Sequence, residues 1–232
     1  MDLTTLLDNR NTKLFEEVSN KCNITFQYSS ENNYACYSEG QSSIIYVPKY
    51  NLSIESFTHE LLHIYLRTKE MYAGGCLTRM INESQELEQL FDKELIDHIT
   101  NVIDHIKMFP IFISLGFDKE KFIDDFDTLK CTEQEIKNLE LYHSLLHNFK
   151  PNFFKLFVGK FFSMKGCPNE KYNYETCFKT MDDLDFILLQ DLNSFYDEWQ
   201  SYDISKNDIF DKHYRDIMSE LVISFKAWNR TN

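Results

Sequence analysis

The spacing of apolar residues divides the chain into a short β-like block and a long helical remainder. Residues 3–19 carry leucine, phenylalanine and valine near helical spacing, which predicts a helix. Three segments rich in β-branched and aromatic residues follow, and turn residues separate them, so we expect a small sheet. These segments are ITFQYSS (24–30), YACYS (34–38) and SIIYVPKY (43–50).

Helical spacing dominates the rest of the chain. Asn51 or Ser53 can cap a helix that runs to about Thr68. Ala73-Gly74-Gly75 predicts a loop, and a long helix is expected from Asn82 to Met108, ending at Phe109-Pro110. Beyond residue 111 nearly every segment has helical spacing, apart from a loop at 165–176.

These elements predict an α+β fold that is mostly helical. We expect residues 1–116 to form a small twisted N-terminal sheet with its helices. Residues 117–232 should form a C-terminal helical half that packs on this part as one compact unit. No repeat, low-complexity tract or convincing linker interrupts the chain.

Composition and charge narrow the classes of function. A net charge of −13 disfavours non-specific binding to nucleic acid or to anionic membranes. The N-terminus lacks the pattern of a secretory signal, and the longest nearly uncharged run (108–117) is too short to cross a bilayer. The six cysteines have no CxxC spacing, so we expect free thiols and a cytoplasmic location.

The stretch HELLH at 59–63 carries the clearest chemical signal. On a helix, His59 and His63 project from one face about 6 Å apart, which lets both imidazoles bind one Zn²⁺. Glu60 lies beside that face, where its carboxylate can take a proton from a zinc-bound water.

A second histidine pair, HSLLH at 143–147, lacks the glutamate. In a chain with seven histidines, HxxxH is expected by chance about 0.2 times and HExxH only about 0.015 times. We therefore interpret HELLH as a metal site, and His143 and His147 as exposed or core-edge residues.

With its HExxH helix after a β-like block, the chain resembles the zincin metallopeptidases. It is similar to compact cytoplasmic types such as the IrrE/ImmA-like peptidases or the gluzincins. The layout matches over residues 20–108, but the motif matches only at His59, Glu60 and His63. Leu66 and Lys69 stand where the metzincin motif HExxHxxGxxH requires Gly and His. The resemblance implies a third ligand on a later helix.

Three residues in the predicted helix 82–108 are candidates for that ligand. His105 is our first choice, because histidine is scarce in this chain and His105 lies at the border of the apolar face. Glu88 is the second choice; with Asp92 it reproduces the ExxxD pattern of gluzincins. His98 is the third.

The expected activity is zinc-dependent hydrolysis of a peptide bond, with limited cleavage of a specific cytoplasmic protein. An edge strand, either YACYS or SIIYV, would pair with the extended substrate. Oxyanion stabilisation would need a residue such as Tyr65, Tyr72, Tyr142 or His143. Two alternatives remain open: a catalytically silent partner-binding module and hydrolysis of a non-peptide amide.

Overall fold

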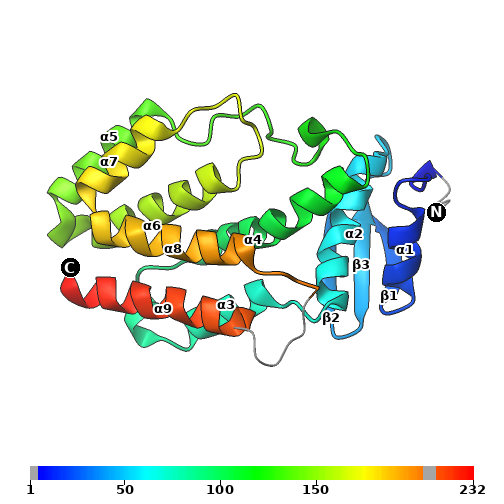
Figure 1. The fold of residues 1–232 in the computed structure, drawn as a ribbon, viewed down its shortest axis with the longest axis horizontal. Coiled ribbons are helices and arrows are strands. Elements are labelled where there is room, and N and C mark those ends of the chain that lie inside the picture. Colours follow the sequence, from blue (N-terminus) through cyan, green and yellow to red (C-terminus); the bar gives the residue numbers. More distant parts are fainter. Residues whose placement is uncertain (1–4, 206–212) are drawn as a thin grey trace. The chain divides into compact units, whose positions relative to one another are not determined.

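The computed structural model describes residues 5–205 and 213–232. It has an α+β architecture, with one small sheet near the N-terminus and helices over most of the remainder (Figure 1). Among the described helices, no apolar stretch reaches the length that a bilayer crossing requires. The elements are α1 (Thr12–Ser19), β1 (Asn23–Tyr28), β2 (Ala35–Glu39), β3 (Ser42–Val47), α2 (Ile54–Thr68), α3 (Ala73–Asn82), the 3-10 turn η2 (Gln85–Leu87), α4 (Lys93–Ser114), the 3-10 turn η3 (Lys119–Lys121), α5 (Glu133–Ser144), α6 (Leu146–Lys165), α7 (Glu175–Leu184), α8 (Phe186–Ser201) and α9 (Tyr214–Thr231).

The described chain divides into two compact units, and neither is continuous in sequence. Unit 1 extends to Met71 and resumes over Lys107–Phe126. Unit 2 comprises Tyr72–Ile106 and the described residues from Asp127 onward. The boundary predicted at residue 116 differs from this division, because the chain leaves unit 1 before α3 and re-enters it within α4.

The sheet of unit 1 has the strand order β1-β3-β2. β1 pairs parallel with β3, and β2 pairs antiparallel with β3. The β2–β3 hairpin turns at Gly40, whose φ of 56° lies in the region that glycine adopts without strain. β3 is therefore the central strand, and within the described residues β1 and β2 form the two edges.

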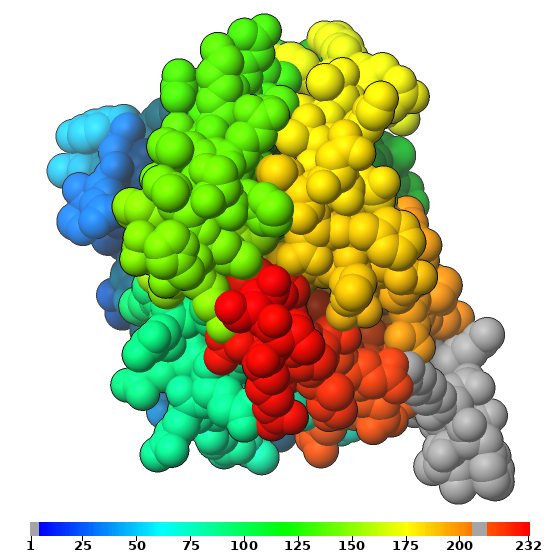
Figure 2. All heavy atoms as spheres, turned by 90° about the vertical axis from the view of Figure 1, so that its left-hand side faces the viewer, coloured from blue at the N-terminus to red at the C-terminus, as the bar shows by residue number. Residues whose placement is uncertain are grey.

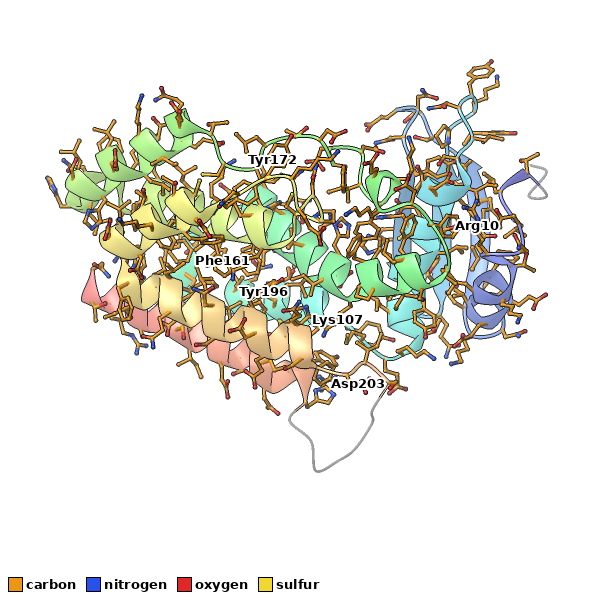
Figure 3. The ribbon with its side chains drawn as sticks, turned by 45° about the horizontal axis from the view of Figure 1, so that its top comes forward. Arg10, Lys107, Phe161, Tyr172, Tyr196 and Asp203 are labelled. Atoms are coloured by element: carbon orange, nitrogen blue, oxygen red, sulfur yellow. The ribbon has the colours of Figure 1, made fainter. Side chains whose placement is uncertain are left out.

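Aromatic rings join this sheet to its helices. Phe15 of α1, Phe26 of β1 and Phe57 of α2 contact one another, with ring centroids 6.1–6.4 Å apart. Nearby, Arg10 (labelled in Figure 3) forms an ion pair with Asp8 and lies 4.0 Å from the ring centroid of Phe117. Contacts from residue 117 thus hold the returning segment of unit 1 to its N-terminal part.

Unit 2 is built around the phenylalanines of α6. Five of them are fully buried: Phe153, Phe154, Phe157, Phe161 and Phe162. They pack against aromatic rings of other unit 2 elements, including Phe91, Phe195, Phe225 and Trp228. Figure 2 shows α9, in red, lying between the teal segment of α3 and η2 and the yellow to orange α8, and contacts between these elements agree. These aromatics form the helical core of unit 2.

Two predictions in the first third of the chain, one of a helix and one of a loop, were wrong. The helix expected over residues 3–19 begins only at Thr12, and residues 1–4 lie outside the described part of the chain. Ala73-Gly74-Gly75, expected to be a loop, forms the first turn of α3. Glycine is required at position 74 because α3 and α4 pack closely there: a Cβ at Gly74 would lie 2.9 Å from the Thr100 Cβ of α4.

The long helix expected from Asn82 to Met108 is interrupted. The Asp92 side chain accepts a hydrogen bond from the Leu95 amide at 2.9 Å, and this cap begins a new helix, α4. α4 then continues through Pro110 instead of ending there. Met108 and Phe112 are fully buried on either side of Pro110, and burying two such side chains offsets the roughly 3 kcal/mol that an interior proline costs.

Candidate metal centre

Helix α2 presents the HELLH residues at a fixed place against the sheet. The Ser53 hydroxyl accepts a hydrogen bond from the Ser56 amide at 3.1 Å and caps the helix. The residues that anchor α2 in the core are fully buried: Phe57, Leu61, Leu62 and Ile64. His59, Glu60 and His63 lie on the half-buried side, and the two imidazole centroids are 5.2 Å apart.

His105 completes a cluster of three histidines. One ring nitrogen from each of His59, His63 and His105 lies within 4.8 Å of the others, and all three residues are half-buried. His105 stands on α4, two residues before the helix enters unit 1 at Lys107. Nitrogens that share one tetrahedral zinc are about 3.4 Å apart, so small side-chain rotations would suffice for coordination.

The surroundings of His59 keep its imidazole neutral and oriented. A ring N–H of His59 donates a hydrogen bond to the backbone carbonyl of Phe122. Burial and the nearby charge of His63 lower the pKa of His59 to about 3. A neutral imidazole held through one nitrogen can offer the other to a cation, which is how outer contacts usually orient metal-binding histidines.

Aromatic rings exclude water from one side of the cluster. The Phe122 ring centroid lies 4.9 Å from that of His59 and about as close to Phe109 and Phe112, at 5.1 and 5.2 Å. Phe122 and Phe112 are buried. Electrostatic interactions at the cluster are stronger in such apolar surroundings than they would be in water.

Glu60 is half-buried and directed toward β2. Burial raises the pKa of its carboxyl, and the charge of Asp124 acts in the same direction. The charge of His63 and hydrogen bonds from the thiol and the backbone amide of Cys36 lower the pKa. A carboxylate with a raised pKa beside the His63 imidazole is suited to accept a proton from a metal-bound water.

The sheet distinguishes the two candidate substrate strands. SIIYV is the central strand β3, paired on both sides, whereas YACYS contains β2, an antiparallel edge strand that contacts α2 (Figure 1). An edge strand has backbone groups that can pair with an extended peptide. Of the two strands, only β2 offers this edge within the described residues.

Glu88 and His98, the other candidate ligands, lie away from the cluster. Glu88 follows η2, before the start of α4, and lines a cavity of about 660 Å³ together with Asp92. The His98 Nε2 lies 3.2 Å from the Gly159 carbonyl and 3.0 Å from the Ser163 hydroxyl. The carbonyl can only accept, so Nε2 carries the proton and is engaged in packing α4 against α6.

HSLLH does not form a histidine pair on one helix. His143 lies in the last turn of α5 and His147 in the first turn of α6, with Leu145 in a non-helical conformation between them. The His143 ring packs on Phe153, at 5.4 Å between centroids, and His147 is exposed. These positions agree with the interpretation of both residues as core-edge or exposed.

The four candidates for oxyanion stabilisation remain predictions. The Tyr65 ring lies 4.8 Å from the Lys69 amine, and Tyr72 is largely exposed. Tyr142 stacks on Phe149 within unit 2.

Sequence reasoning missed three residues at the cluster: Cys36, Phe122 and Asp124. Cys36 faces α2, and the alternation of side chains along β2 was only a weak indication of this. Phe122 and Asp124 come about sixty residues after the motif. Helical spacing predicted a helix there, and this was wrong, because the described chain has only the 3-10 turn η3 between α4 and α5.

Comparisons with protein-family models, curated proteins and solved structures found no match.

Proposed function

We propose that this chain is a zinc-dependent metallopeptidase in which His59, His63 and His105 bind the metal and Glu60 is the general base. The main support is the approach of the three imidazole nitrogens to within 4.8 Å of one another. Three neutral nitrogen ligands with a neighbouring carboxylate are the donor set of a catalytic zinc site, which leaves a coordination position for water or substrate.

Each residue has a role that follows from its place. Zinc, when bound, would polarise the scissile carbonyl and lower the pKa of the attacking water. Glu60 accepts the proton of this water and delivers it to the leaving amine nitrogen. The edge of β2, outside the Cys36 N–H that bonds Glu60, holds an extended peptide beside Glu60. Phe122 and its neighbouring rings keep bulk water from His59.

The arrangement is similar to a zincin, with a small sheet, an HExxH helix and a third ligand on a later helix. We infer limited cleavage of a specific protein, and this part rests on the analogy alone. None of the six cysteines forms a disulfide, which fits a reducing compartment such as the cytoplasm.

Metal analysis of chelator-free protein tests the proposal. We expect about one zinc per chain, lost in His59→Ala and His105→Ala because three ligands are needed for tight binding. Glu88→Ala and His98→Ala should keep the metal, since neither residue belongs to the cluster. His147→Ala is the matched control for removing an exposed histidine.

Activity is measured on a library of quenched fluorescent peptides. Glu60→Gln should retain zinc and lose turnover by 10²-fold or more, as expected when a general base is removed. Wild-type protein without zinc would contradict the proposal and favour a partner-binding module. A Glu60→Gln variant with full activity would exclude Glu60 as the base.

A further inference from the structure

Cys36 lies where β2 faces the HELLH helix. In the β2–β3 register, Cys36 pairs with Ile45 and Ser38 pairs with Ser43. Ile45 and Ser43 are buried, and the Ser38 and Ser43 hydroxyls are 2.7 Å apart. Side chains alternate along a strand, so Cys36 and Ser38 point to the covered face of the sheet, where β2 contacts α2.

Two groups of Cys36 bind the Glu60 carboxylate. The thiol and the backbone N–H both donate a hydrogen bond to it. Because the Cys36 N–H is directed to Glu60, it points away from β3 and toward the free edge of the sheet. The general base is therefore held by the same strand that we expect to bind substrate.

We propose that Cys36 is a positioning residue for Glu60, and that its thiol selects the carboxylate orientation used for proton transfer. The inference rests on the proposed function. A glutamate side chain has several rotamers, and ordering them costs free energy at each turnover unless contacts have already selected one. The two hydrogen bonds from Cys36 supply this selection.

A thiol suits this task because it is a weak donor. A lysine or arginine in its place would form an ion pair and greatly reduce the basicity of the carboxylate. The Cys36 thiol restricts Glu60 while leaving its charge available to accept a proton from water.

Substitution at Cys36 separates positioning from packing. Cys36→Ala removes the side-chain donor and keeps the backbone N–H, whereas Cys36→Ser restores a donor of similar size. We expect Cys36→Ala to lower kcat about tenfold, as for a lost hydrogen bond to a charged group, with KM and zinc content unchanged. Cys36→Ser should recover most of kcat.

Cys22→Ala is the matched control. Cys22 is another half-buried thiol of this sheet region, and its sulfur lies 3.2 Å from the Ser43 hydroxyl. Its removal should leave kcat unchanged. Unchanged kcat in Cys36→Ala, or a Cys36→Ser variant as slow as Cys36→Ala, would overturn the inference.

A second readout does not depend on turnover. The S–H stretching band of Cys36 is identified in infrared difference spectra as the band that Cys36→Ser removes. It should shift to higher frequency in Glu60→Ala, because the acceptor is lost, and a band that does not move would also overturn the inference. If Glu60→Gln keeps full activity, the proposed function fails; if Glu60→Gln is inactive and Cys36→Ala is fully active, only the role of Cys36 fails.

Discussion

At the scale of single residues, the cluster works only if its imidazoles are neutral. Three protonated rings within 4.8 Å would repel one another and could not bind a cation. Burial of His59 opposes its protonation, and a proton on His63 would oppose it further. The burial that keeps His59 neutral for metal binding should therefore also make the metal-free protein sensitive to acid.

The pH dependence of stability tests this directly. The folded pKa of His59, about 3, lies below its ordinary value of 6.5. Between these values the unfolded chain binds more protons, so stability is complete above pH 6.5 and falls as the pH decreases. The contribution of His59 to the slope of the free energy of unfolding against pH should approach about 1.4 kcal/mol per pH unit.

Urea unfolding of chelator-treated protein between pH 5 and 8 measures this slope. His59→Leu should flatten it, whereas His147→Ala, which removes an exposed histidine, should not. An unchanged slope in His59→Leu would mean that another group causes the acid sensitivity.

At the scale of elements, α3 shows how tertiary packing overrides local preference. Gly74 and Gly75 are adjacent, yet a Cβ at Gly74 would lie 2.9 Å from the Thr100 Cβ, while a Cβ at Gly75 would meet nothing within 4 Å. Two glycines in a row predict a loop. The close approach of α4 explains the first glycine.

Alanine substitutions at the two positions should have opposite effects. Gly74→Ala should destabilise the protein by about 1–3 kcal/mol, because the new methyl group forces α3 and α4 apart. Gly75→Ala should stabilise it by about 0.5–1 kcal/mol, because alanine loses less backbone entropy in a helix. Denaturant unfolding of both variants gives the comparison, and equal effects would disprove the role assigned to Thr100.

Sequence patterns correctly predicted the elements whose structure depends on residues close together in the chain. The three strands, the break at Gly40 and the start of α2 at Ser53 follow from alternation and capping. The continuation of α4 through Pro110 could not be predicted, because it depends on the burial of Met108 and Phe112 by distant segments. Asp92 fits the ExxxD pattern in the sequence, whereas in the structure its carboxylate caps α4.

At the scale of the whole molecule, the site combines segments that the sequence keeps far apart. The motif identified His59, Glu60 and His63 as candidates, and the scarcity of histidine favoured His105 over Glu88. No local pattern could indicate that the chain returns to unit 1 at Lys107, because α4 crosses this boundary as one uninterrupted helix. For that reason the contact of Phe122 with His59 could not be predicted from the sequence. The contact of Cys36 with Glu60 depends on how α2 packs against β2, which the motif does not specify.

Because its ligands come from α2 and α4, zinc should stabilise the fold as a whole. A ligand that binds only the folded chain adds about 2.7 kcal/mol to the free energy of unfolding when its free concentration is 100 times Kd. For a chain of this size each kcal/mol raises Tm by about 2–4 °C, so zinc should raise Tm by about 5–10 °C. Thermal unfolding with and without a chelator measures the shift. It should vanish in His105→Ala and persist in His98→Ala, two variants that each remove one histidine from α4. An equal shift in His105→Ala would place the stabilising zinc at other ligands, and the three-histidine centre would then be wrong.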